Sequence, residues 1–77
     1  MNSREDSIKK IVFSTLYKDI SNLNVHLIDD LNMDSLDAIS FLFEVEQEFD
    51  IKIPESDIDL FGLFHLKKLD DYIESKI

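Results

Sequence analysis

The sequence contains no cysteine, one glycine, one proline and two histidines among its 77 residues. Without cysteine there is no disulfide, no thiolate metal ligand and no cysteine nucleophile. His26 and His65 are too isolated to indicate a metal cluster, so we predict no metal site. No apolar run is long enough to span a membrane, and the first residues lack the basic start and apolar stretch of a signal peptide. We therefore expect a cytoplasmic chain without membrane insertion.

Positive charge is scarce as well, because 8 Lys and Arg face 17 Asp and Glu, for a formal net charge of −9. Residues 29–59 hold eleven acidic side chains and one base, Lys52, so this stretch alone carries −10. Such a field repels nucleic acid and anionic membranes and favours partners with basic surfaces. Composition alone equally allows the acidity to serve only solubility.

The spacing of apolar residues predicts three main helices and one short helix, with no strand pattern. The expected ranges are Ser3 to about Lys18, Ser35 to about Phe49, Glu55 to Phe61, and Leu63 to Ile77, the last with a start anywhere from residue 62 to 66. A chain of this length should form one domain, residues 1–77. We predict an all-α fold, a small four-helix bundle around a single core, and a monomer.

The apolar residues from Asp19 to Met33 show no sustained periodicity, and the turn-forming residues of this segment predict a loop. Scattered apolar residues should pin this loop to the core, namely Val25, Leu27, Ile28 and Leu31. A loop this long in a small domain tends to be functional. Its expected task is to deliver Ser35 to the start of the second helix. Tyr17 and Tyr72 are expected at the edge of the core.

The second predicted helix has two apolar faces. The face that should turn to the core consists of Ala38, Phe41, Leu42, Val45 and Phe49. A second stripe on the far side consists of Leu36, Ile39 and Phe43, and the acidic flank between the two faces consists of Asp37, Glu44 and Glu48. We expect Leu36 and Phe43 to be exposed for a partner, and Ile39 to be partly buried.

The start of this helix holds a serine between two aspartates. Asp34 is a good N-cap residue, and Asp37 follows three positions later, as in a capping box. The Ser35 hydroxyl would then lie in the first turn, where backbone N–H groups are unpaired and the helix dipole favours negative charge. A phosphate ester on Ser35 would be electrostatically favourable at this position.

A calcium-binding loop is one alternative reading of the same stretch. Asp30, Asn32 and Asp34 have the spacing of the oxygen ligands that open an EF-hand loop. The turn position should then be glycine but is Ser35, and the twelfth position should be glutamate but is Phe41. The pattern therefore fails at two positions that the calcium site requires.

A serine hydrolase is a second alternative. A nucleophilic serine needs a general base and an oxyanion hole. Ser35 does not lie in a Gly-x-Ser-x-Gly elbow, and no motif ties either histidine to it. We predict no catalytic residues and no enzymatic activity, and interpret Ser35 as a site that another enzyme modifies.

A family resemblance supports this interpretation. The stretch Asp30-Leu31 followed by Asp34-Ser35-Leu36 and an acidic helix resembles the acyl carrier proteins. The resemblance continues through the segments Glu46-Gln47-Glu48-Phe49-Asp50, Ile53-Pro54 and Asp71-Tyr72-Ile73, and covers essentially the whole chain. The Ile-Pro pair nineteen residues after the serine makes the match more specific than the short triplet alone.

The resemblance implies a covalent cofactor and a set of partners. A phosphopantetheinyl transferase would move 4′-phosphopantetheine from coenzyme A to Ser35, and the arm would carry acyl groups as thioesters. The partners would be fatty-acid or related polyketide and lipid enzymes with basic docking patches. By position, the resemblance assigns recognition to the acidic residues Asp34, Asp37 and Glu46 and to the apolar residues Leu36, Ile39 and Phe43.

The chain also departs from the family pattern. Asn32 stands where glycine is usual, although asparagine tolerates a left-handed backbone. Ser40 and Gln47 stand where the family has acids, which changes the charges offered to partners. The segment from Phe61 to Leu66 is long and apolar, and it either reshapes an acyl cavity or fills the core.

Two other functions stay open at this point. One is a peptidyl or aminoacyl carrier of a specialised pathway, and the other is an unmodified acidic helical module that only docks partners. The acidic second helix favours fatty-acid or polyketide-type acyl chains over aminoacyl and peptidyl carriers.

Overall fold

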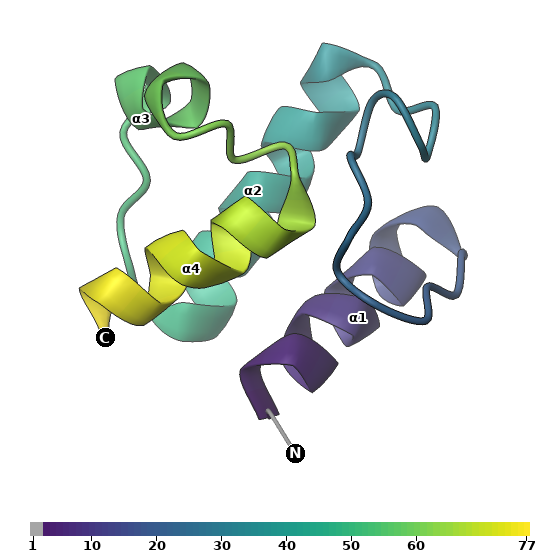
Figure 1. Ribbon diagram of the computed structural model, residues 1–77, viewed down its shortest axis with the longest axis horizontal. Helices are drawn as coiled ribbons and strands as arrows, with labels where there is room; N and C mark the ends of the chain where they lie inside the picture. The colour runs from purple at the N-terminus through teal and green to yellow at the C-terminus, as the bar shows by residue number, and fades with distance from the viewer. Residues whose placement is uncertain (1–2) are drawn as a thin grey trace.

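A computed structural model describes residues 3–77, which form four helices joined by turns and loops (Figure 1). The helices are α1 (Ser3–Leu16), α2 (Ser35–Phe49), α3 (Glu55–Leu60) and α4 (Leu66–Lys76). The only β pairing among the described residues is an isolated antiparallel bridge between His26 and His65. The predicted all-α fold with three main helices and one short helix is confirmed. No helix in residues 3–77 is both long and apolar enough to cross a membrane.

The core is built from the helix faces that apolar spacing predicted. The buried apolar residues of the three main helices are Ile8, Ile11, Val12, Ala38, Phe41, Leu42, Val45, Leu66, Leu69, Tyr72 and Ile73. The short helix α3 adds Ile58, and the turn after it adds Leu63, which is fully buried. Leu63 and the partly buried Phe64 therefore pack into the core, whereas Phe61 of the same apolar segment is 50% exposed.

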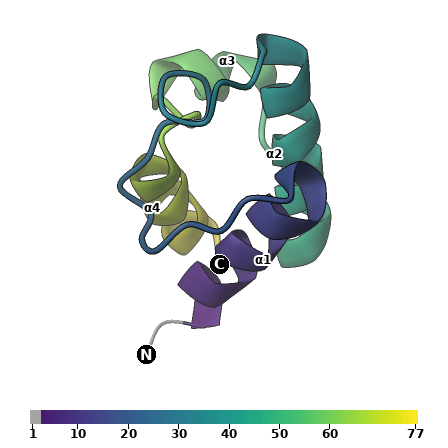
Figure 2. The same cartoon turned by 90° about the vertical axis from the view of Figure 1, so that its right-hand side faces the viewer.

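The connection from α1 to α2, residues 17–34, runs around one side of the bundle and passes the start of α4 (Figure 1, Figure 2). Leu27 N–H donates to Phe64 O at 2.8 Å, and Leu66 N–H donates to Val25 O at 2.9 Å. The predicted anchors of this loop do reach the core, with Leu27 buried and Val25, Ile28 and Leu31 partly buried. The loop is therefore fixed to the bundle at its middle, ahead of the start of α2.

The end of α1 and the Tyr17 side chain differ from the expectations, whereas the start of α4 lies within its predicted range. Helix α1 stops at Leu16 rather than near Lys18, because Tyr17 has a left-handed backbone with φ 57°. Tyr17 is 82% exposed, so its expected place at the core edge is wrong, whereas Tyr72 is buried there as expected. Helix α4 begins at the late end of its predicted range, because a turn around Gly62 with φ 62° precedes it.

Helices α1 and α4 are tied by a buried ion pair. Arg4 Nε donates to Asp70 Oδ1 at 2.5 Å, and Asp70 is only 3% exposed. The Arg4 guanidinium also reaches Glu74 Oε2 at 3.5 Å. These hydrogen bonds and charges raise the pKa of Arg4, so the guanidinium stays charged and holds the first turn of α1 against α4.

Candidate functional site

Ser35 is the first residue of α2, and its side chain is exposed. Asp34 before it has an extended backbone, with φ −83° and ψ 171°, and its Oδ1 accepts the Asp37 N–H at 2.8 Å. Ala38 N–H donates to Asp34 O at 3.0 Å, which closes the first helical turn. The predicted N-cap is thus confirmed, and it fixes the orientation of Ser35 in the first turn of α2.

The backbone just before the cap is also held in place. Asn32 has φ 57°, the left-handed conformation that asparagine tolerates better than most residues, so the turn survives without glycine. Met33 is buried, and its N–H donates to Leu27 O at 3.1 Å. Met33 is buried in the core and the Asp34 side chain caps α2, so both residues are held in place. The exposed Ser35 therefore follows directly after a fixed segment of backbone.

The surroundings of Ser35 suit a phosphodiester. The hydroxyl lies in the first turn, where unpaired N–H groups and the helix dipole favour an anion. Its neighbour Leu36 is 74% exposed, so a long substituent on Ser35 meets open solvent and an apolar side chain. The residues present therefore fit a 4′-phosphopantetheine arm that leaves the protein surface at this point.

The apolar stripe predicted on α2 lies where helical spacing placed it. Leu36 and Phe43 are 74% and 57% exposed, and Ile39 is partly buried. The acidic flank of Asp37, Glu44 and Glu48 is exposed beside it. The helix that begins with Ser35 thus presents large apolar side chains and carboxylates to solvent together, a combination suited to protein recognition.

Glu46 differs from the other acids of α2, because it also bonds within the molecule. The residue is partly buried, and its Oε2 accepts the Ile53 N–H at 2.6 Å. This bond holds the segment after α2 against the helix. A role for Glu46 in recognition stays a prediction, and any partner would meet a carboxylate with one oxygen already engaged.

Ser40 lines a small depression next to the site. A pocket of about 290 Å³ lies between the end of α1 and the first turns of α2, with Met33, Phe41 and Leu16 among its lining residues. Asp37 and Glu44 belong to the same lining. The short side chain of Ser40 is thus part of the wall of this depression.

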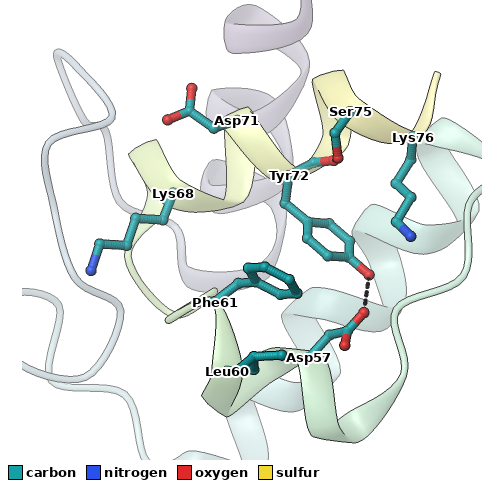
Figure 3. Close-up of a pocket in the computed structure, with 8 residues that line it drawn as sticks. All are labelled: Asp57, Leu60, Phe61, Lys68, Asp71, Tyr72, Ser75 and Lys76. Carbon is teal, nitrogen blue, oxygen red and sulfur yellow. Dashed lines mark hydrogen bonds between the residues drawn. The ribbon is translucent and has the colours of Figure 1, made fainter.

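A larger groove of about 520 Å³ lies between α3 and α4 and contains no residue of α2 (Figure 3). Tyr72 O–H donates to Asp57 Oδ2 at 2.7 Å, and the Phe61 ring lies 5.5 Å from the Tyr72 ring. Burial of the phenol, this hydrogen bond and the nearby carboxylates of Asp57 and Glu46 raise the pKa of Tyr72 to about 12. The contacts of Tyr72 with Asp57 and Phe61 in this groove thus join α3 to α4.

The histidine near the site is bound to the backbone. His26 Nδ1 accepts the N–H groups of Ile28 and Asp29, each at 3.1 Å. The imidazole is therefore engaged in a turn and not in activating a serine. Sequence reasoning missed this role, because histidine is not among the usual capping residues and only its place before a turn could have indicated it.

The two carboxylates with the spacing of EF-hand ligands, Asp30 and Asp34, also accept hydrogen bonds from the backbone. Asp30 Oδ2 accepts the His26 N–H at 2.6 Å, and Asp34 Oδ1 accepts the Asp37 N–H. Among residues 3–77, no group of three or more His, Asp or Glu side chains is arranged to hold a metal ion. The arrangement at Ser35 is that of an exposed hydroxyl on a fixed helix start.

Comparisons with known proteins point to one family. The family model described as "Phosphopantetheine attachment site" matches residues 6–67. An acyl carrier protein of Buchnera aphidicola subsp. Schizaphis graminum is 40% identical over 78 residues, which cover 99% of this chain and 96% of that protein. An acyl carrier protein of Campylobacter lari is 33% identical over 72 residues, which cover 91% of each chain.

Proposed function

Because the chain belongs to the acyl carrier protein family, we propose that Ser35 is the residue to which its 4′-phosphopantetheine arm is attached. As a member of this family, the chain carries acyl groups as thioesters on that arm. The arm supplies the terminal thiol, which this cysteine-free chain lacks. The observation that carries the assignment is the exposed Ser35 hydroxyl on the first residue of α2, directly after the Asp34 cap.

The attachment needs no catalytic group from this chain. The Ser35 Oγ attacks the phosphorus that bears the pantetheine in coenzyme A, a P–O bond of the pyrophosphate breaks, and 3′,5′-ADP leaves. The hydroxyl proton passes to a base of the phosphopantetheinyl transferase, which also holds the Mg²⁺ for this step. This chain supplies position, because the cap and the buried Met33 hold the hydroxyl outward.

We further propose that partners dock on α2 around Ser35. Leu36, Ile39 and Phe43 provide the apolar contacts, with Phe43 as an aromatic anchor for a pocket in the partner. Asp34, Asp37 and Glu46 provide negative charge toward basic patches on the transferase and on fatty-acid or acyltransferase enzymes. The exposed flank charges of Asp37, Glu44 and Glu48 would steer the approach of such partners.

The experiment is a loading assay read by intact mass. The chain is incubated with coenzyme A, Mg²⁺ and a broad-specificity phosphopantetheinyl transferase, alongside Ser35→Ala and the matched control Ser40→Ala. Ser40 is an exposed serine in the second turn of the same helix. We expect the native chain and Ser40→Ala to gain one phosphopantetheine, and Ser35→Ala to gain none. Loading of Ser35→Ala would overturn the assignment, and no loading of the native chain would favour an unmodified docking module.

A further inference from the structure

The segment that leads to Ser35 is a single hydrogen-bonded turn. The N–H groups of Asp30 and Leu31 donate to His26 O at 2.9 and 3.2 Å. Farther along the same segment, backbone bonds of 3.1 Å join Asn32 N to Ile28 O and Met33 N to Leu27 O. Every backbone donor from residue 30 to 33 is therefore satisfied within the turn, and the turn ends one residue before the Asp34 cap.

The His26 side chain closes the open end of this turn. Its Nδ1 lies 3.1 Å from both Ile28 N and Asp29 N and accepts both N–H groups. An N-cap oxygen of serine or aspartate makes the same contacts at the start of a helix. In return, Asp30 Oδ2 accepts the His26 N–H at 2.6 Å, so the two ends of the turn cap each other.

This cap requires a neutral imidazole with its proton on Nε2. A protonated imidazole donates from both nitrogens and cannot accept the two N–H groups that point at Nδ1. Histidine is the side chain that ordinarily changes charge between pH 5 and 8. A proton on Nδ1 would therefore force the ring to turn away and leave two backbone donors without an acceptor.

The groups around the His26 imidazole determine which partners the ring has once it is protonated. Asp29 Oδ2 lies 3.8 Å from His26 Nδ1, and the Asp30 carboxylate is bound to the His26 backbone. Neither carboxylate replaces the lost acceptor. His65 is paired with His26 in the β-bridge, and the Phe64 ring meets the imidazole edge-on with centroids 6.4 Å apart. The charged ring can thus pair with Asp29 in solvent while the turn opens.

We propose that His26 is a positioning residue for the modification of Ser35, and that its neutral imidazole caps the turn that presents the serine. This rests on the proposed attachment of phosphopantetheine at Ser35. Protonation of His26 opens the turn over residues 26–33, and the transferase then meets a less ordered approach to the hydroxyl. The chain is accordingly a poorer substrate in mildly acidic solution than near neutrality.

The activity test compares His26→Asn and His26→Ala with the native chain over about pH 5.5–8. Asparagine offers an acceptor that does not titrate, so His26→Asn rescues loading and should remove the part of the pH dependence that belongs to the cap. We expect kcat/KM of the transferase for the native chain, divided by that for His26→Asn, to fall about threefold from pH 8 to 5.5. A ratio that stays constant would overturn the proposal. His65→Gln, a control for the second histidine, should keep the native profile.

A second readout does not depend on Ser35. Nitrogen NMR of the unmodified chain should show His26 as the Nε2–H tautomer at pH 8, and hydrogen exchange at Ile28 and Asp29 should quicken about fivefold in His26→Ala, the effect of a typical lost N-cap. An Nδ1–H tautomer or unchanged exchange would overturn the cap itself. If the native chain is not loaded at any pH, the attachment site and this positioning role both fail, whereas normal loading with a constant ratio removes only the role of His26.

Discussion

At the scale of single residues, carboxylates around α2 serve the fold and remain available as charges. Asp34 accepts the Asp37 N–H, and Glu46 accepts the Ile53 N–H. A hydrogen-bonded carboxylate keeps its negative charge, so a structural bond and a docking role are compatible. An alanine substitution removes both functions together, whereas an amide substitution keeps an acceptor and removes only the charge.

Glu46 allows these two functions to be separated. Glu46→Ala removes the acceptor of the Ile53 N–H and should lower the free energy of unfolding by about 1.5 kcal/mol. Glu46→Gln keeps an acceptor oxygen and should stay within about 0.5 kcal/mol of the native chain. If the charge takes part in docking, Glu46→Gln should still raise the KM of the transferase about threefold, the size of a typical exposed ion pair. Urea unfolding and loading kinetics measure the two quantities.

The matched control is Glu48→Gln, which removes the charge of an exposed acid two residues farther along α2. It should leave stability almost unchanged and shows how much KM responds to net charge alone. An unchanged KM in Glu46→Gln would contradict the docking role and leave Glu46 with its structural bond only.

At the scale of helices, Tyr72 makes the contact between α3 and α4 dependent on pH. Its pKa is raised to about 12, from about 10 in an unfolded chain, so the folded state favours the neutral phenol. This stabilisation is fully present below about pH 10 and is lost as the pH rises toward 12. We expect the free energy of unfolding to fall by about 2 kcal/mol over that range because Tyr72 must ionise.

A background of Tyr17→Phe isolates the effect, because the chain has two tyrosines and Tyr17 is 82% exposed. In this variant an ultraviolet absorbance titration reports Tyr72 alone, and urea unfolding at about pH 9 and pH 11.5 reports its effect on stability. Adding Tyr72→Phe should remove the fall that belongs to this residue. A titration midpoint near 10 would contradict the buried, hydrogen-bonded phenol.

The tie between α1 and α4 depends on a buried charge. Arg4→Met leaves Asp70, which is 3% exposed, without its main partner and should cost about 3 kcal/mol. Lys67 Nζ lies 4.0 Å from the other Asp70 oxygen and can compensate only in part. The double variant Arg4→Met/Asp70→Leu should recover much of the loss, because no buried charge remains.

Urea unfolding measures these changes, and the exposed Lys10→Met is the control for removing one positive charge from α1. The control should change the free energy of unfolding by less than about 0.5 kcal/mol. An Arg4→Met variant as stable as this control would show that the ion pair does not hold the two helices.

Sequence patterns predicted the elements well where apolar residues recur over several turns. The bounds of α2 and its capped start followed from the Asp34-Ser35 pair and the two apolar faces. The start of α4 could be predicted only as a range, residues 62 to 66, because Gly62, Leu63 and Phe64 offer no side-chain acceptor for an N-cap. The pairing of Arg4 with Asp70 across 66 positions could not be read from local spacing, and neither could the cap made by His26. Contacts between distant segments depend on how the loops place them.

At the scale of the whole molecule, charge is divided between regions. Residues 29–59, which include α2 and all of α3 except its last residue, carry −10, and the rest of the chain carries +1. The lysines outside this stretch lie mainly on α1 and α4, as in Lys9, Lys10, Lys67, Lys68 and Lys76. We therefore expect a basic partner to be attracted toward the acidic stretch that contains Ser35, with an orientation of approach set by the charge distribution.

The same uneven charge should destabilise the isolated chain. Like charges within residues 29–59 repel one another more strongly in the folded state than in the expanded unfolded chain. Added salt screens this repulsion, and a divalent cation can do so at lower concentration. We expect the melting temperature to rise by about 5 °C in moderate salt or millimolar Mg²⁺, which corresponds to about 1 kcal/mol for a domain of this size.

The matched variant Glu44→Gln/Glu48→Gln removes two exposed charges from the acidic flank of α2. If repulsion limits stability, this variant should melt at a higher temperature than the native chain in low salt and gain less from added Mg²⁺. Calorimetry of both proteins with and without Mg²⁺ measures the difference. A melting temperature that is flat or falls as Mg²⁺ is added to the native chain would contradict the repulsion argument. In that case, the acidity would serve partner recognition without a measurable cost to the fold.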